Sequence, residues 1–159
     1  MIVVADTSPL NYLILIDAVD LLPSLYGSIY TAPACASELS APGAPEEVRR
    51  WFENRPDWMV VTAPEEASDP RLAHLDLGER EAIALALQLR ADLVLIDERD
   101  GRMAVEACGL TVAGTLRVLA EGAAIGVVNL TEAFARLRST TFRADPQLME
   151  LLLGGQRRD

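Results

Sequence analysis

Two short apolar runs each end abruptly in an aspartate, and they constrain the fold more than any other feature. The first covers residues 2–5 and is followed by Asp6, and the second covers residues 93–96 and is followed by Asp97. Apolar runs without alternation are typical of strands buried on both faces of a parallel sheet. Because the carboxyl ends of parallel strands meet at one edge, we expect both aspartates at that edge, near the centre of the sheet.

Helical patterns separate the apolar runs along the whole chain. The first begins at Thr7-Ser8-Pro9, which predicts a hydroxyl N-cap and proline at the first helical position. Residues 64–75 are predicted as loop with a helical turn. Further strands are predicted over residues 28–32, 58–62 and 110–112, and further helices over 19–26, 34–39, 46–54, 78–89, 99–107, 115–123, 131–139 and 145–153. This alternation predicts one α/β domain over residues 1–159, a three-layer sandwich with a central, mainly parallel sheet and a frayed tail at about 154–159.

The composition is acidic and hydrophobic at once. Fourteen Lys and Arg residues against 24 Asp and Glu residues give a net charge of −10. Proteins that hold nucleic acid by bulk charge carry basic faces, so this balance argues against that class of binder. Half of the residues are hydrophobic, which excludes a disordered acidic tail. The acid surplus is therefore either a solvated surface or a site.

The chain is expected to be cytoplasmic and without membrane contact. Its first ten residues lack the basic start and the long apolar centre of a signal peptide. The longest apolar stretches are too short to span a bilayer. Cys35 and Cys108 have no neighbouring Cys or His at a metal-ligand spacing, and two free thiols fit a reducing compartment.

Asp6 and Asp97 allow two interpretations. A single aspartate at a strand end most often caps the following turn or helix. Two carboxylates on adjacent strands repel and raise each other's pKa unless a cation lies between them. Mg²⁺ and Mn²⁺ suit such all-oxygen ligands. The pair therefore favours a metal site.

Glu79 is the next candidate ligand. It follows Asp76, the expected cap of the Ala-rich helix, and it heads an apolar stripe that continues at positions i+3, i+4 and i+7. A carboxylate at the head of a buried stripe is expected to face the domain interior. Glu81 lies on the other side of the helix and is expected to be solvated or in a salt bridge.

Other polar residues near these motifs carry weaker signals. Glu38 lies on the helix after the second strand, where a surface glutamate is the default. Thr7 and Ser8 are candidate hydrogen-bond donors to Asp6, with N-capping as an equal alternative. Of Glu98 and Asp100, one is expected to join the site and the other to cap the next helix.

Several motifs of other chemistries do not occur. The sequence lacks a G-x-G-x-x-G after its first strand and a G-x-x-x-x-G-K-[ST], which excludes dinucleotide and P-loop sites of the usual kind. It also lacks G-x-S-x-G, and its single histidine has no nucleophile in a recognisable context.

The order of four segments resembles the PIN-domain ribonucleases. The segments are IVVADTSPLNYL, IYTAPACASEL, LDLGEREAIALALQLRADLVLIDERDGR and LTVAGTLRVL. The opening D-T-S-P-L, and G-E-x-E-A-I-x-L-A before the L-x-I-D strand, resemble the VapC-like toxins. The resemblance covers about residues 2–125, and the last helices fit the C-terminal extension of the family.

This resemblance implies an endoribonuclease dependent on Mg²⁺ or Mn²⁺, with Asp6, Glu38, Glu79 and Asp97 as its catalytic acids. Asp6, Glu79 and Asp97 would hold the metal. Glu79 stands at a position that is commonly aspartate in the family. The chain departs from the family pattern in two ways: Leu95 supplies no hydroxyl where many members have Thr-x-Asp, and the further acid of the site is either Glu98 or Asp100. Arg80, Arg99 and Arg102 flank the acidic motifs as candidate contacts to RNA phosphate, with surface salt bridges as the alternative.

The same resemblance implies a toxin inhibited by a cognate antitoxin protein, and a homodimer. Four site acids and two divalent ions would reduce the charge of −10 to −6, so the acidity is in part a metal site. The alternative function is a non-catalytic α/β binding module whose acidic pocket holds a structural cation or a protein partner.

Overall fold

Five parallel strands form the centre of the molecule. The computed structural model describes residues 1–66 and 69–157. The strands follow the order β3-β2-β1-β4-β5, and every pairing is parallel. They are β1 (Val3–Ala5), β2 (Ile29–Thr31), β3 (Met59–Val61), β4 (Leu93–Leu95) and β5 (Val112–Ala113). The two aspartate-terminated runs are therefore adjacent, with β1 central, as the sequence predicts.

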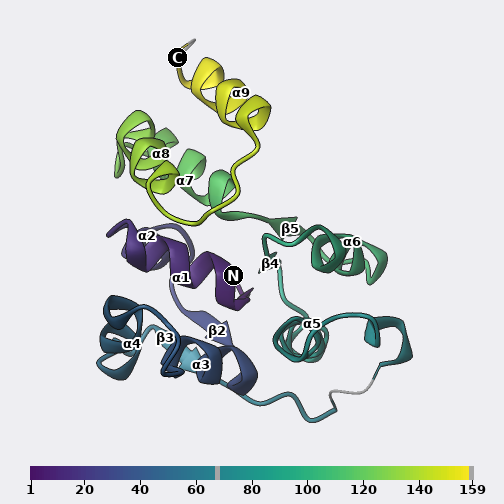
Figure 1. Ribbon diagram of the computed structural model, residues 1–159. Helices are drawn as coiled ribbons and strands as arrows, with labels where there is room; N and C mark the ends of the chain where they lie inside the picture. Colours follow the sequence, from purple (N-terminus) through teal and green to yellow (C-terminus); the bar gives the residue numbers. More distant parts are fainter. Residues whose placement is uncertain (67–68, 158–159) are drawn as a thin grey trace.

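Helices cover both faces of this sheet (Figure 1). One face packs against α1, α2, α4, α7, α8 and α9, and the other packs against α5 and α6, while α3 contributes side chains to both cores. The helices are α1 (Thr7–Leu15), α2 (Leu21–Tyr26), α3 (Pro33–Ser40), α4 (Glu46–Glu53), α5 (Leu77–Leu89), α6 (Arg99–Ala107), α7 (Thr115–Ala124), α8 (Leu130–Arg138) and α9 (Pro146–Arg157), with a 3₁₀ turn at Pro70–Leu72. The expected three-layer α/β sandwich is confirmed.

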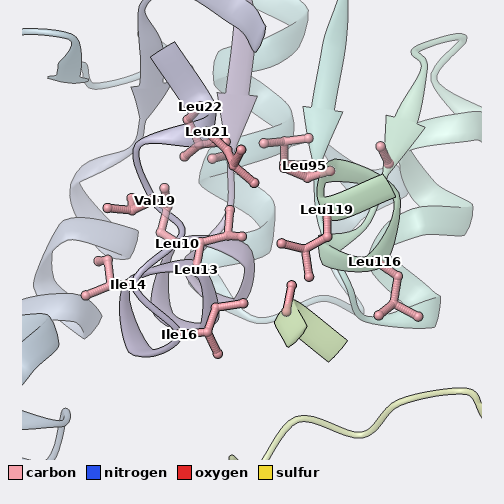
Figure 2. Packing of buried hydrophobic residues seen from close by; sticks show 14 of the residues in the cluster. Leu10, Leu13, Ile14, Ile16, Val19, Leu21, Leu22, Leu95, Leu116 and Leu119 are labelled. Atoms are coloured by element: carbon pink, nitrogen blue, oxygen red, sulfur yellow. The ribbon is translucent and has the colours of Figure 1, made fainter. Parts of the chain in front are cut away.

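Alternation along the strands explains why two separate apolar cores form. Val3 and Ala5 belong to one core and Val4 to the other, because successive side chains of a strand point to opposite faces. Figure 2 shows the first core from close by, with side chains of α1, α2 and α7 packed around Leu95 of β4. Burial on both faces accounts for the unbroken apolar runs in the sequence.

The strand order reverses between β1 and β4. From β1 the chain moves outward through β2 to β3, and it then returns to the other side of β1 to form β4 and β5. In open parallel sheets such a reversal leaves a crevice beyond the carboxyl ends of the two strands, where ligands commonly bind. Asp6 and Asp97 lie at this crevice.

Two helix ends differ from the prediction. Helix α1 begins at Thr7 with Asp6 as its N-cap residue, so Pro9 occupies the third helical position rather than the first. Proline fits there because the first N–H groups of a helix have no intrahelical partner. The tail was expected to fray from residue 154, yet α9 continues to Arg157, and residues 158–159 lie outside the described residues.

The C-terminal helix packs on its own domain. Met149 is 1% exposed, and Leu148, Leu152 and Leu153 pack against the first core, whereas Leu151 is 73% exposed. This packing supports the helix up to the two glycines at 154–155, each of which costs about 1 kcal/mol relative to alanine in a helix. Within the described ranges, no helix is long and apolar enough to cross a membrane.

Candidate active site

Asp6 is a buried carboxylate that follows β1 directly. It occupies the N-cap position of α1 without making a side-chain cap bond, and only 5% of its surface is exposed. Its Oδ1 accepts a hydrogen bond from the Cys35 thiol, with Sγ 3.4 Å away. Burial raises the pKa of Asp6 to about 6, against the lowering effect of the Thr7 backbone N–H and of the Cys35 thiol.

Glu79 is a second buried carboxylate, in the first turn of α5. The Asp76 carboxylate caps this helix by accepting a hydrogen bond from the Glu79 backbone N–H at 2.8 Å, as the sequence predicts. Glu79 itself is 7% exposed, and its Oε2 is buried without a hydrogen-bond partner. Burial raises the pKa of Glu79 to about 8, with further contributions from Asp76, from the charge of Asp6 and from that of Glu98.

Asp97 is held firmly at the end of β4. Its Oδ1 accepts a hydrogen bond from the Thr115 backbone N–H at 2.7 Å. Its Oδ2 accepts from the hydroxyls of Thr115 and Ser8, both at 2.8 Å. Donors from the first turns of α7 and α1 therefore fix the orientation of this carboxylate.

Three glycines make room for the carboxylates. A Cβ on Gly78 would lie 2.7 Å from Glu38 Oε1, one on Gly101 would lie 2.9 Å from Glu79 Oε2, and one on Gly114 would lie 2.9 Å from Asp97 Oδ1. Each distance is shorter than side-chain carbons tolerate. The backbone thus leaves space for these acids, and exposed Glu38 reaches the start of α5 across the gap from α3.

The acids near the switch point act on one another electrostatically. The charges of Asp76 and Glu38 raise the pKa of Asp6, and Asp6 in turn raises that of Glu79. Glu98 joins this group, whereas Asp100 lies with Arg71 and His74 beside another cavity of about 260 Å³. Glu98 occupies the N-cap position of α6 without a side-chain cap bond, so neither acid caps this helix in the expected way, and the choice of the extra site acid stays a prediction.

The donor set suits a hard divalent cation. All of the candidate ligands are carboxylate oxygens, and the unpartnered Glu79 Oε2 is an oxygen without a compensating donor. Among the described residues, no three His, Cys, Asp or Glu side chains form a group that could hold an ion by themselves. Mg²⁺ keeps several of its own waters, so these acids would hold it partly through water.

Other predicted contacts are replaced by different ones. Ser8 donates to Asp97 rather than to Asp6, because its position in the first turn of α1 places it beside β4. The Thr7 hydroxyl is buried without a hydrogen-bond partner, so neither its predicted bond to Asp6 nor its N-cap role is present. Glu81 is half-buried and forms no salt bridge with any described residue; its Oε1 accepts a hydrogen bond from the Ala34 N–H at 3.0 Å and thereby caps α3.

The three predicted arginines take two different positions. The side chain of Arg80 folds back along α5, where its Nε donates to the Asp76 carbonyl oxygen at 3.4 Å. Arg99 and Arg102, on α6, line a cavity of about 590 Å³ that also includes Asp97 and Ser8. Of the three predicted arginines, Arg99 and Arg102 therefore open onto a space next to Asp97.

Sequence reasoning missed two residues that hold the acids in place. Cys35 on α3 contacts Asp6, and its thiol also donates to the Gly78 carbonyl oxygen at 3.5 Å. Burial, followed by the charge of Asp6, raises the pKa of Cys35 to about 12, so the group stays a neutral donor. Thr115 was detectable in principle, because Gly114-Thr115 follows a strand that ends at the same sheet edge.

Comparison with protein-family models shows to which family the chain belongs. A family model described as a PIN domain matches residues 2–155, which is nearly the whole chain. The chain is a PIN-domain protein. PIN domains are typically nucleases and usually use divalent metal ions. No curated protein and no solved structure matches this PIN domain.

Proposed function

We propose that this PIN domain is a divalent-metal-dependent endoribonuclease, the cytoplasmic toxin of a VapC-like toxin–antitoxin pair. The observation that carries the proposal is two buried carboxylates, Asp6 and Glu79, whose negative charges repel each other, together with the Glu79 Oε2 atom, which has no hydrogen-bond partner. Burying two ionised carboxylates together is costly unless a cation neutralises them. Their position at the switch point of the sheet supports a metal site that serves a bound substrate.

Asp6, Glu79 and Asp97 would hold Mg²⁺ or Mn²⁺ directly or through water, and Glu38 would complete the pocket. A bound ion of this kind supplies charge neutralisation for the scissile phosphate and acidifies a coordinated water. Ser8 and Thr115 keep Asp97 in one orientation, so that its oxygens stay available in a fixed place. The Cys35 thiol does the same for Asp6.

The proposed reaction is hydrolysis of an RNA phosphodiester bond. Water attacks phosphorus in line with the 3′ oxygen, the P–O3′ bond breaks, and the products carry a 5′-phosphate and a 3′-hydroxyl. Arg99 and Arg102 line the space beside Asp97, and in this proposal they contact phosphate oxygens of the RNA. The acids at the reacting phosphate and the arginines beside it thus have separate tasks.

The test is cleavage of structured RNAs by purified protein in Mn²⁺ or in EDTA. We expect cleavage with Mn²⁺ only, lost in Asp6→Asn and kept in Asp57→Asn, a matched change at an exposed aspartate. Equal cleavage by Asp6→Asn would assign the activity to a contaminating nuclease and contradict the proposal. Binding of Mn²⁺ without any cleavage would instead favour a non-catalytic binding module.

The toxin role adds a protein partner and a second copy of the chain. We take the exposed Leu151 of α9 as the residue through which the two copies would meet. Light scattering after size exclusion is expected to show a dimer that Leu151→Glu weakens. A monomer at all concentrations would refute the dimer, and a neighbouring open reading frame for a small antitoxin would support the pairing.

A further inference from the structure

The cavity of about 590 Å³ is a compartment separate from the buried acid pair. Asp97, Glu98 and Ser8 line its inner end, whereas Asp6, Glu38 and Glu79 do not line it. Its other walls come from α6, from the start of α7 and from residues 141–152. Its volume lies within the roughly 300–1,000 Å³ common for small-ligand sites. The compartment therefore begins at the acids and leads away from them.

Arginines are concentrated at this cavity. All 14 basic residues of the chain are arginines, and four of them line it: Arg99, Arg102, Arg117 and Arg143. Within the part of the chain that the structure describes, ion pairs form at Arg50 and Arg71 only, so the four guanidinium groups here have no carboxylate partner within 4 Å. Four carboxylates also line the cavity, so its formal charge is zero in a chain of net charge −10.

One of those carboxylates is already in use. The Asp145 Oδ1 accepts the backbone N–H groups of Gln147 and Leu148 at 3.0 and 3.4 Å, which caps α9. Asp97 and Glu98 lie at the acid end, where a bound cation would offset them. The outer part of the cavity therefore repels an anionic chain less than the net charge of −10 would suggest.

An aromatic pair fixes the C-terminal wall. The Tyr12 hydroxyl of α1 hydrogen-bonds to Thr141 Oγ1 at 2.8 Å, and the Tyr12 and Phe142 rings meet edge to face with centroids 5.0 Å apart. Both rings are half-buried and line the cavity. This long-range contact fixes Phe142 in the wall of the cavity, which Arg143 also lines.

We propose that this cavity binds the unpaired nucleotides of the RNA strand that flank the cleaved bond, with arginines on the phosphates and Phe142 under a base. The assignment rests on the proposed ribonuclease function. Guanidinium groups bind phosphate oxygens with two parallel hydrogen bonds, and bases of single strands stack on aromatic rings. A duplex buries its base faces, so the cavity selects single-stranded segments.

The test measures binding of a fluorescein-labelled, unstructured oligoribonucleotide by anisotropy, in EDTA and over a range of KCl concentrations. The variant Arg117→Gln/Arg143→Gln is compared with Arg90→Gln/Arg138→Gln, which removes the same charge from exposed positions outside the cavity. Each lost phosphate contact lowers the salt slope by about 0.7, so the cavity variant is expected to lose about 1.4 and to bind about tenfold more weakly. The control pair should match the wild type.

Phe142 is tested in the same assay. We expect Phe142→Leu to weaken binding at least fivefold and Phe142→Tyr to restore it, because stacking needs a ring and not merely an apolar side chain. Urea unfolding of each variant checks that the C-terminal wall remains folded.

Several results would overturn the assignment. They are equal binding by the cavity and control variants, no binding by wild type at low salt, equal binding of a duplex, or displacement of RNA by polyglutamate of equal charge. The last result would mean that an acidic protein segment is the better occupant. Binding is measured without metal, so the two proposals can fail separately. If the wild type binds RNA through the cavity but does not cleave it in Mn²⁺, only the ribonuclease function is refuted. If it cleaves RNA but the cavity and control variants bind equally well, only the assignment of the cavity is refuted.

Discussion

The stability of the metal-free protein is expected to fall as pH rises, and Glu79 is the main cause. Burial raises its pKa from 4.5 to about 8, so the folded protein holds this proton more tightly than the unfolded chain does. A group with a raised pKa stabilises the folded state fully below pH 4.5, and this stabilisation is lost as the pH rises to about 8. The sign is opposite to that of a carboxylate in a salt bridge.

The structure sets the size of the effect. At about 1.4 kcal/mol per pKa unit, the rise from 4.5 to about 8 corresponds to a limit of about 5 kcal/mol. Water entry and side-chain relaxation screen part of such a cost, so we expect a loss of about 2–3 kcal/mol for Glu79 between pH 5 and pH 8.5. Asp6, with its pKa raised to about 6, adds to the loss at the lower end of this range.

The assay is urea unfolding at pH 5, 7 and 8.5 in EDTA, for wild type, Glu79→Gln and the exposed control Glu53→Gln. Glu79→Gln should flatten the pH dependence and stabilise the protein at pH 8.5, and Glu53→Gln should follow the wild type. Mg²⁺ should restore stability at pH 8.5 to wild type but much less to Glu79→Gln. An identical pH profile for Glu79→Gln and wild type would refute the argument from burial.

Three further changes test the supports of the site. Gly101→Ala places a Cβ 2.4 Å from Ile96 Cδ1 and 2.9 Å from Glu79 Oε2. Thermal unfolding should show that this variant loses about 1–3 kcal/mol of folding stability, and it should cleave RNA more slowly. The control Gly154→Ala adds a Cβ in open space and should not destabilise the protein. Thr115→Val removes a buried hydroxyl that donates to Asp97, so urea unfolding should show a loss of about 1–2 kcal/mol of folding stability. The same variant should lower kcat more than it changes KM, and Thr115→Ser should stay close to wild type. An unchanged kcat in Thr115→Val would contradict the orienting role. Glu81→Gln keeps an acceptor for the Ala34 N–H but removes a negative charge from the start of α3. Urea unfolding should therefore show a loss of only about 0.3–1 kcal/mol of folding stability. A larger loss would show that the charge itself holds α3.

Local sequence patterns predicted most of the secondary structure and the inward orientation of one site residue, Glu79. The cap at Asp76 and the apolar stripe that follows Glu79 predicted that this side chain faces inward, and its exposure of 7% agrees. The capping hydroxyl at the start of α1 was misassigned because aspartate and threonine are both good N-cap residues and stand next to each other in the sequence. The carboxylate of Asp6 was not needed for capping, which leaves it free for the site.

By itself, the sequence determined the parallel sheet and the edge at which Asp6 and Asp97 emerge. Those features follow from the lengths and the unbroken apolar character of two runs, which depend on neighbouring residues alone. The tertiary structure decided which groups meet these carboxylates: the Cys35 thiol at Asp6, Ser8 and Thr115 at Asp97, and Glu38 in the space left by Gly78. It also decided that residues 141–152 close a cavity beside them. Such contacts join residues far apart in the chain, and only the packing of helices against both faces of the sheet sets their distances.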